Sequence, residues 1–548
     1  MLNHLLRAFL FGTWALLSLT NGIAQVDTLE VALPLFDLQY SQSERDSLRA
    51  GISSLRSDYQ TLHSLELDNS IPPALMFNPI PVGMELEERQ DPIIWSLPEA
   101  QLPPNLSELA FYSVGELAFL LRSRKITSTQ LTKLYLERLK TYGDTLHCAI
   151  TLLEDIALEQ AAQADRELAM GRWRGPLHGI PYGVKDLFAY PGYPTTWGAA
   201  PYREQTRDEK ATVIAKLEEA GAVLVAKLTL GALAMGDVWY GGTTRNPWNL
   251  EQGSSGSSAG SASATVAGLV GFAIGTETWG SIVSPSTRCG ATGLRPTYGR
   301  VSRHGAMALS WSMDKVGPIC RTAEGCAMVF QAIIGTDEKD QTLIDVPFNY
   351  SQIVDLSQLK IGYASNLMDR NYYNSSRDSA VLETLQGLGA ELIPLEWEPS
   401  IPVDALSIIL TAEAAAAFDQ LTRSGRDDLL VRQGKNAWPN IFRQGQMISA
   451  VAYIQANRHR YQLIQEMHAF MQQVDVLVVP SFGSNQLLTT NLTSHPAVVM
   501  PNGFLPNGSP TSITFLGNLY EEGTILAVAR AYQAASKFED MHPPMFMK

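Results

Sequence analysis

Cysteine and histidine are scarce in this chain, which has 4 Cys and 9 His among 548 residues. No CxxC pair and no HExxH motif occurs, and these spacings are the usual sequence signals of a zinc site. A thiol nucleophile with a histidine partner is not indicated either. We therefore expect chemistry that uses no metal ion and no cofactor. Cys320 and Cys326 are the nearest pair of cysteines, and we expect them to be free thiols in the core.

Positive charge is also in deficit. The chain has 41 Lys and Arg against 55 Asp and Glu, which gives a formal net charge of -14 at pH 7. A polyanionic partner would meet net repulsion from such a protein. We therefore expect no nucleic-acid partner.

Long apolar runs are missing after residue 24. The run at residues 8–19 has about 12 residues, whereas a helix that spans a bilayer needs about 20. Arg7 precedes this run and the small residues Gly22 and Ala24 follow it. This layout predicts a cleaved secretory signal at residues 1–24. We expect an exported protein, periplasmic or secreted, with no stable membrane insertion after signal cleavage.

The next part of the chain, residues 25–107, is predicted to be an N-terminal extension. It contains an amphipathic segment at residues 43–64 and a segment at residues 71–104 with eight prolines. Proline fixes its own φ and cannot donate a backbone hydrogen bond. The second segment is therefore expected to be an extended stretch of chain that packs on the main body.

From residue 108 to residue 545, helical patterns alternate with short β-rich runs. Apolar residues recur at three and four spacing in residues 114–122 and 128–141, and Ser113 and Thr127 precede these segments as N-caps. Alternation of this kind predicts the α/β class. We expect a single large domain with a mixed, mostly parallel sheet covered by helices on both faces.

A block rich in glycine and serine, residues 253–263, is the most unusual stretch. Within it, Gly256, Ser258 and Gly260 fit the G-x-S-x-G elbow of α/β-hydrolases, which requires a hydrophobic strand immediately before it. Residues 246–252 are predicted to be a loop instead. A serine esterase of the α/β-hydrolase type that uses Ser258 stays open as an alternative.

Three separated motifs resemble those of the amidase signature family. They are GPLHGIPYGVKD at residues 175–186, GSSAGS at residues 256–261 and GTETWGSI at residues 275–282. The resemblance extends from about residue 113 to residue 535 and implies the amidase signature fold. Further segments agree with the family in the same order: residues 244–249, 293–302, 314–322 and 491–501.

The resemblance implies a Ser-Ser-Lys catalytic triad. Ser281 matches the nucleophile, Ser257 matches the bridging serine held by a cis peptide bond, and Lys185 matches the base. Lys185 would draw a proton through Ser257 from Ser281, and water would hydrolyse the resulting acyl-enzyme. A lysine can do this near neutral pH only where its ammonium form is disfavoured. The apolar neighbours Ile180 and Val184 are compatible with such burial.

In relatives, backbone N–H groups in the turn that ends at the nucleophile form the oxyanion hole. The matching substrate-binding residues are Thr278, Trp279 and Gly280. This turn departs from the common family pattern, because Glu277 replaces Asp, Trp279 replaces Gly and Val283 replaces Arg. The variant GTETxGSI is similar to that of peptide amidases. For the side chain of Trp279 we expect a place in the core rather than in a pocket wall.

Three other polar residues near these motifs are expected to have supporting roles. Asp186 would point away from Lys185 on a strand and is predicted to be a structural hydrogen-bonding group. His178 is predicted to be a turn residue. Ser258 is expected to orient the site without joining the triad.

The resemblance implies an enzyme, an amidase that hydrolyses the C–N bond of a linear carboxamide. Its partner would be a small-molecule or peptide amide substrate, and it would act as a monomer or homodimer. Glutamyl-tRNA amidotransferase A subunits of the family are cytosolic and work with partner subunits, so the predicted signal and Glu277 argue against that role. A non-catalytic binding protein on the amidase fold remains an alternative, although all three triad positions are occupied.

Overall fold

The computed structural model describes residues 28–65, 67–368 and 372–547. The predicted signal peptide at residues 1–24 lies outside them. The chain forms two compact units, Met1–Leu67 and Asp68–Lys548. The boundary predicted near residue 108 stays a prediction, and it falls inside the second unit.

The described part of the first unit is helical. It contains α2 (Thr28–Ala32), the 3-10 helix η1 (Leu33–Phe36) and α3 (Gln42–His63). Ser41 caps α3, since its hydroxyl accepts the N–H of Glu44 while the Glu44 carboxylate accepts the N–H of Ser41. The predicted amphipathic segment is therefore a helix, and its two ends each lie one residue earlier than expected.

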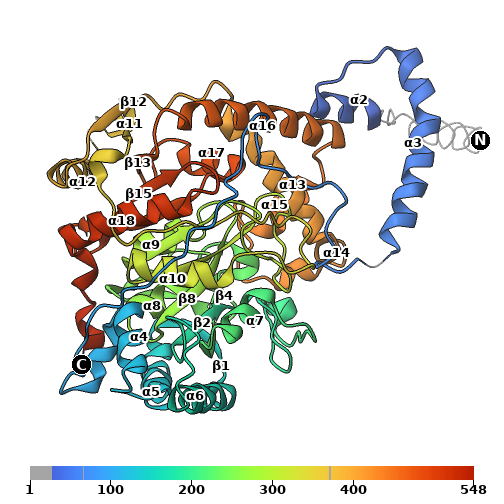
Figure 1. The fold of residues 1–548 in the computed structure, drawn as a ribbon. Helices are drawn as coiled ribbons and strands as arrows, with labels where there is room; N and C mark the ends of the chain where they lie inside the picture. The colour runs from blue at the N-terminus through green and yellow to red at the C-terminus, as the bar shows by residue number, and fades with distance from the viewer. Residues whose placement is uncertain (1–27, 66, 369–371, 548) are drawn as a thin grey trace, which may run out of the picture. The chain divides into compact units, whose positions relative to one another are not determined.

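A large mixed sheet runs through the second unit (Figure 1). Among the described residues it has 11 strands. In spatial order these are β1 (Ala149–Leu152), β3 (Val223–Leu228), β2 (Pro181–Lys185), β8 (Phe272–Glu277), β10 (Lys315–Cys320), β9 (Thr292–Arg295), β14 (Ala497–Phe504), β15 (Pro510–Gly517), β13 (Val476–Pro480), β11 (Ile361–Ala364) and β12 (Leu392–Leu395).

The sheet is mixed, as predicted, but its parallel share is smaller than expected. Parallel pairing joins β3, β2 and β8 on one side and β13, β11 and β12 on the other. The remaining neighbours, including all of those in the centre, pair antiparallel. The hairpin of β14 and β15 explains part of this difference, because a short connection between adjacent strands forces them to run antiparallel.

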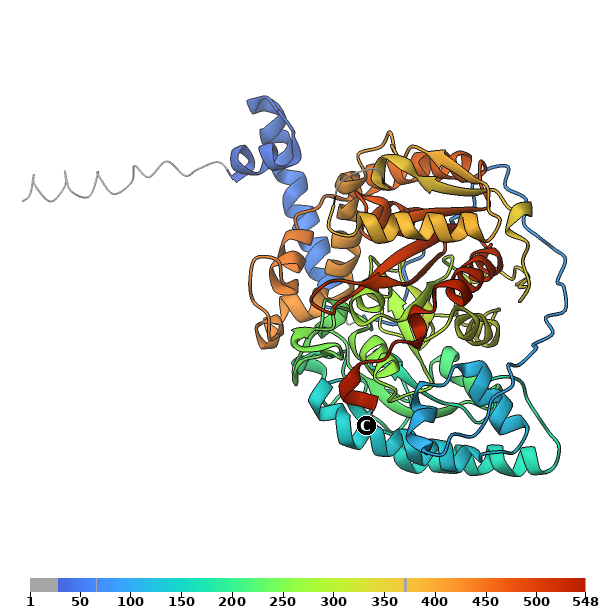
Figure 2. The same cartoon turned by 90° about the vertical axis from the view of Figure 1, so that its left-hand side faces the viewer.

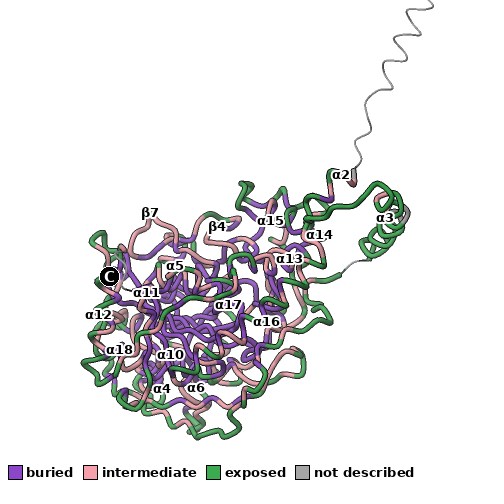
Figure 3. The backbone as a smooth tube through the Cα atoms, turned by 90° about the horizontal axis from the view of Figure 1, so that it is seen from above, coloured by how far each residue is buried: buried purple, intermediate pink, exposed green. Residues whose placement is uncertain are grey.

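Helices cover both faces of the sheet, which confirms that part of the prediction. Leu224 of β3 packs in one hydrophobic cluster with Leu117 of α4 (Val114–Arg122) and Phe330 of α10 (Ala323–Ile333). Val225, the next residue, packs in another cluster with Leu136 of α5 (Ser128–Leu146). Since successive strand residues point to opposite faces, the two clusters lie on opposite sides of the sheet. Figure 3 shows the buried residues gathered in this interior.

The second unit contains helices that contact this sheet and helices that pack mainly on one another. Within the described residues they are α4 (Val114–Arg122), α5 (Ser128–Leu146), α6 (Glu154–Ala169), α7 (Thr212–Glu219), α8 (Ala259–Val266), α9 (Val283–Cys289), α10 (Ala323–Ile333), α11 (Ser365–Met368), α12 (Ser375–Gly387), α13 (Ile408–Ala417), α14 (Asp419–Arg423), α15 (Trp438–Gly445), α16 (Ala450–Met471), α17 (Gln486–Thr493) and α18 (Glu522–Ser536).

Two local predictions are confirmed. Ser113 and Thr127 cap α4 and α5, each in a reciprocal capping box with the side chain three residues later. Cys320 and Cys326 are buried free thiols.

The proline-rich segment is extended chain on the surface of the second unit (Figure 2). Side-chain hydrogen bonds attach it at intervals. Gln90 donates to the carbonyl of Phe348 at 2.9 Å, and Trp95 donates to Gln331 at 2.7 Å. It therefore packs on the main body, as predicted.

Candidate active site

Lys185 is the last residue of β2, and its amino group is completely buried. The Nζ atom lies 2.7 Å from Oγ of Ser257, 2.8 Å from Oγ1 of Thr276 and 3.3 Å from Oγ of Ser258. Two of the three predicted catalytic residues are thus in direct contact. Thr276 is a contact that the sequence reasoning missed, although it lies inside the GTETWGSI motif.

Burial of the amino group lowers the pKa of Lys185 to about 7, although the charges of Asp314 and Glu277 raise it in part. The groups within hydrogen-bonding distance of Nζ are hydroxyls and the carbonyl of Thr276, at 3.5 Å. Neutral acceptors do not compensate the charge of an ammonium group as a carboxylate does. A sizeable fraction of Lys185 is therefore a neutral amine near pH 7.

Ser257 and Ser258 lie on the loop that leads into α8. The peptide bond between Gly256 and Ser257 is cis, as the resemblance implied. The Ser258 hydroxyl accepts the N–H of Thr276 and donates to the carbonyl of the same residue, both at 3.1 Å. Gly275 makes room for this hydroxyl, because a Cβ there would lie 2.7 Å from it. Ser258 is thus fully occupied in fixing its loop to β8.

The turn at residues 278–281 brings Ser281 next to this loop. The N–H of Ser258 donates to the carbonyl of Ser281 at 3.1 Å, so the two serine segments are joined through the main chain. Ser281 is half-buried, and its hydroxyl makes no hydrogen bond within the described residues. Gly280 has φ of +87°, a conformation that favours glycine.

Glu277, the last residue of β8, stabilises this turn through hydrogen bonds. Its carboxylate accepts the N–H groups of Ile282 and Val283 at 2.8 and 2.9 Å, directly after Ser281. Its other oxygen accepts from Arg295 at 3.0 Å and from Asn491 at 2.8 Å. All of these groups are buried.

Burial of Glu277 raises the pKa of its carboxyl, but the Arg295 charge and the accepted hydrogen bonds outweigh this and hold the pKa below its ordinary value. The carboxylate is therefore ionised and keeps both backbone donors. Arg295 and Asn491 lie inside matched segments, but the sequence reasoning gave them no role.

A sequence model of the family described as Amidase matches residues 130–526. The chain belongs to the amidase family. It is therefore an enzyme that acts on carbon–nitrogen bonds. The A subunit of the glutamyl-tRNA(Gln) amidotransferase of Marinomonas sp. (strain MWYL1) is 33% identical over 485 residues, which cover 79% of this chain and 98% of that protein.

Solved structures agree with this assignment. The peptide amidase of Stenotrophomonas maltophilia superposes with a TM-score of 0.69 at 28% identity, over 78% of this chain and 97% of that chain. A bacterial aryl acylamidase of the amidase signature family superposes with the same TM-score at 21% identity, over 80% and 98% of the two chains, and shows the shared fold.

Trp279 of this amidase is not in the core, and that expectation was wrong. Its side chain is 44% exposed. Its neighbour Thr278 turns inward and donates from its hydroxyl to the buried carboxylate of Asp314. Trp279, the next residue of the turn, is consequently left facing solvent.

Asp186 and His178 have the structural surroundings that were predicted. Asp186 forms a buried ion pair with Lys227 at 2.8 Å and accepts the N–H of Thr196 at 2.9 Å. His178 accepts the N–H of Arg174 at 3.0 Å, and burial lowers the pKa of its imidazole. Neither side chain bonds to the Lys185 amino group, whose partners are Ser257, Ser258 and Thr276.

The prediction of a loop at residues 246–252 is wrong in part. Residues Arg245–Asn246 (β6) and Asn249–Gly253 (β7) form a small antiparallel hairpin. This hairpin is separate from the large sheet, so the elbow geometry of an α/β-hydrolase is not present at Ser258.

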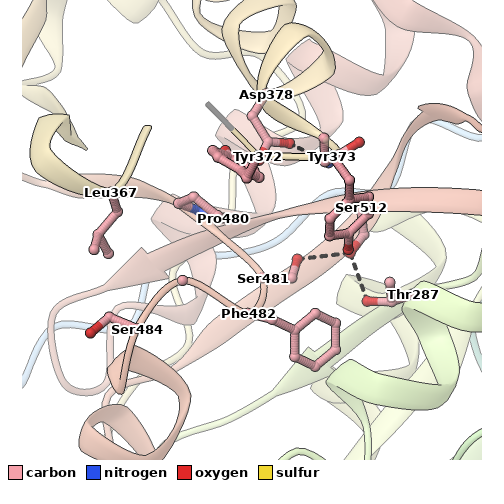
Figure 4. A pocket seen from close by; sticks show the side chains of 12 residues that line it. Thr287, Leu367, Tyr372, Tyr373, Asp378, Pro480, Ser481, Phe482, Ser484 and Ser512 are labelled. Atoms are coloured by element: carbon pink, nitrogen blue, oxygen red, sulfur yellow. Dashed lines mark hydrogen bonds between the residues drawn. The ribbon is translucent and has the colours of Figure 1, made fainter. Parts of the chain in front are cut away.

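The amidase has two cavities near these elements. One, of about 460 Å³, reaches Thr276 and Thr278. The other, of about 310 Å³, lies between α9, the loop after β13 and the region of Asp378 (Figure 4). Its hydroxyl groups bond one another, with Ser512 at 2.7 Å from Ser481 and 2.6 Å from Thr287. In the described part of the chain, no cluster of three or more His, Cys, Asp or Glu side chains is placed to hold a metal ion.

The pKa of Lys185 predicts how activity depends on pH. Only the neutral amine can accept a proton, so kcat/KM should rise from acidic pH and level off above a pKa of about 7. Initial rates on an uncharged carboxamide from about pH 5 to pH 9 measure this profile. A kcat/KM that stays constant across this range would contradict a base role for Lys185.

The matched control is Lys185→Met, an unbranched apolar side chain that cannot accept a proton. It should fold as the wild type does, by circular dichroism, and should lose the activity across the whole pH range.

Proposed function

We propose that this amidase hydrolyses a linear carboxamide through an acyl-enzyme on Ser281, with Ser257 and Lys185 as a proton relay. The observation that carries the proposal is the 2.7 Å contact between the Ser257 hydroxyl and the buried Lys185 amine, whose pKa is lowered to about 7. A buried amine in contact with a serine hydroxyl has no evident structural purpose, since burial of an ionisable group costs stability. The loss of stability caused by burying this amine is understandable if the amine serves as a base.

In the first half of the reaction, Ser281 Oγ attacks the amide carbon while its proton passes to Ser257, whose own proton passes to Lys185. The C=O bond becomes a C–O⁻ bond in the tetrahedral intermediate. The relay then returns a proton to the nitrogen, the C–N bond breaks, and the amine or ammonia leaves. In the second half, water repeats these steps on the ester and releases the carboxylic acid.

Backbone N–H groups of the turn at residues 278–281 would stabilise the developing oxyanion. Such donors contribute only if they stay in place during the reaction. The proposal assigns this positioning to Glu277, which holds the two N–H groups after Ser281, and to Asp314, which holds the Thr278 side chain. Because the donors belong to the main chain, an exposed Trp279 side chain leaves them available.

The similarity to amidotransferase A subunits favours a second candidate, a component of an amidotransferase complex. We prefer the independent hydrolase, a monomer or homodimer, because the predicted signal at residues 1–24 and Glu277 in the turn before Ser281 argue against the amidotransferase role. The peptide amidase is similar over 78% of this chain, so similarity alone does not decide between the two. The two candidates differ in one measurable property. A hydrolase releases ammonia or amine from a carboxamide when purified alone, whereas an amidotransferase component needs its partner subunits for its full reaction.

A covalent probe tests the nucleophile. A serine-directed inhibitor, followed by mass analysis of the peptides, should label Ser281. Ser281→Ala should lose the label, and its kcat should fall at least about 10⁴-fold. Ser258→Ala should keep the label, because Ser258 only fixes its loop. Label on Ser258, or label that survives in Ser281→Ala, would contradict the proposed mechanism.

We also propose that the protein is exported, periplasmic or secreted, with residues 1–24 as its signal. No helix in the described part of the chain is both long and apolar enough to cross a membrane. Expression of the full chain in a bacterial host should yield a mature protein outside the cytoplasm that begins at or near Gln25, as read by N-terminal sequencing. A cytoplasmic protein that retains residues 1–24 would refute the proposal.

A further inference from the structure

The cavity of about 460 Å³ adjoins the proposed catalytic centre. It is lined by Thr276, whose hydroxyl contacts Lys185, and by Thr278 of the turn that carries Ser281. Its volume is within the range of about 300–1,000 Å³ that is usual for small-molecule sites. A group attached to the scissile carboxamide could therefore occupy this cavity.

One side of the cavity is formed by the strap, which we define here as residues 68–77. Residues 69–70 and 72–76 line the cavity. The family model begins only at residue 130, so the strap is a feature of this chain outside the family region. It is the part of the cavity wall that lies outside the region matched by the family model.

The first end of the strap is held against the rest of the second unit by polar side-chain contacts. The Asp68 carboxylate pairs with Arg207 at 3.1 Å. Asn69 donates to the carbonyl of Ala308 at 3.0 Å and accepts its N–H at 2.8 Å, and it also donates to the carbonyl of Ala417 at 3.3 Å. The Asn69 amide thus uses both its donor and its acceptor at this end.

The second end is held by an aromatic side chain. Phe77 packs edge to face on Tyr298, with ring centroids 5.2 Å apart, and the guanidinium carbon of Arg460 lies 3.6 Å from the Phe77 ring centroid. Between the two ends, Pro72 and Pro73 restrict the backbone. The intervening residues are therefore held beside the cavity in few conformations.

Apolar and polar side chains both line the cavity, and the apolar ones include Pro72, Pro73, Leu75 and Met76 of the strap with Met307 and Leu309. Leu75 and Met76 are 77% and 60% exposed, so an apolar group in the cavity would remove apolar surface of both from water. This apolar surface favours an apolar group in the cavity.

Most charged side chains of the cavity wall have partners within the protein, and the exposed Lys339 is the exception among the described residues. Arg303 pairs with Asp340 at 3.1 Å. Asp314 accepts the N–H groups of Leu309 and Ser310 at 2.8 and 2.9 Å. Glu209 pairs with Arg207 at 3.2 Å, and burial lowers the pKa of Lys315 well below its ordinary value. In the buried part of the cavity, a charged substrate group would therefore be desolvated without an available counter-charge, which is unfavourable.

We infer that the strap is a wall of the substrate pocket, and that it selects carboxamides with an uncharged, apolar group next to the scissile bond. This inference rests on the proposed amide hydrolysis. Leu75 and Met76 are its selectivity residues, and Asn69 is the residue that positions them.

The test measures ammonia release from four matched substrates, the C-terminal amides of N-acetylated Phe, Leu, Asp and Lys. We expect kcat/KM of the wild type to be at least about 100-fold higher for the Phe and Leu amides than for the Asp and Lys amides. The double variant Leu75→Ala/Met76→Ala should lower kcat/KM for the Phe amide about 10-fold, mainly through a higher KM. It should thereby reduce the ratio of kcat/KM between the apolar and the charged amides. Asn69→Ala should also lower kcat/KM for the Phe amide, because it removes the hydrogen bonds that position Leu75 and Met76.

The control variant is Val82→Ala, a change in the same extended segment at a residue that is 76% exposed and does not line the cavity. It should keep the selectivity of the wild type. The strap variants should keep the label on Ser281 and the wild-type pH profile, which separates a change of selectivity from damage to the catalytic centre.

Several results would overturn the inference. They are strap variants with unchanged selectivity, a uniform rise in activity on all four amides, a preference of the wild type for the Asp or Lys amide, and a wild type that is labelled at Ser281 but hydrolyses none of the four. A wild type that neither takes the label nor hydrolyses any of them would refute the proposed function itself.

Discussion

The site depends on an amino group that is buried among hydroxyl groups without a carboxylate in contact. A second buried lysine shows the contrast, because Lys227 on the neighbouring strand β3 has Asp186 as an ion-pair partner at 2.8 Å. Lys185 has Ser257, Ser258 and Thr276 instead. Two lysines at similar depth in the sheet therefore differ in role, since one is a charge held by its counter-ion and the other an amine with hydroxyl neighbours.

The end of β8 supplies most of what surrounds this amine. Gly275 leaves space for the Ser258 side chain, Thr276 contacts Lys185, Glu277 holds the N–H groups after Ser281, and Thr278 reaches Asp314. Four successive residues thus make four different contacts. Because β8 is paired in register between β2 and β10, these contacts are fixed by the sheet rather than by a mobile loop.

The sequence allowed the helices after Ser113 and Thr127, their caps and the two-sided cover of the sheet to be predicted, because periodicity and capping are local properties. The meeting of Lys185 with Ser257 was implied by the resemblance to the amidase signature family and not by periodicity. The exposure of Trp279 was not predictable, since the neighbouring Thr278 turns toward Asp314, which directly precedes another strand, β10. The large antiparallel share of the sheet depends on the order of strands in space, which alternation along the chain does not specify. For the same reason, no local pattern indicated that residues 69–76 line the cavity next to Thr276.

The most direct measurement is the titration of Lys185 itself. Lysine labelled with ¹⁵N at Nζ, with the spectrum of Lys185→Met used for assignment, reports the protonation of this amine by NMR. The account predicts a single lysine that titrates with a pKa of about 7 and is missing from the variant. A Lys185 that stays protonated up to the ordinary lysine pKa of about 10.4 would contradict it.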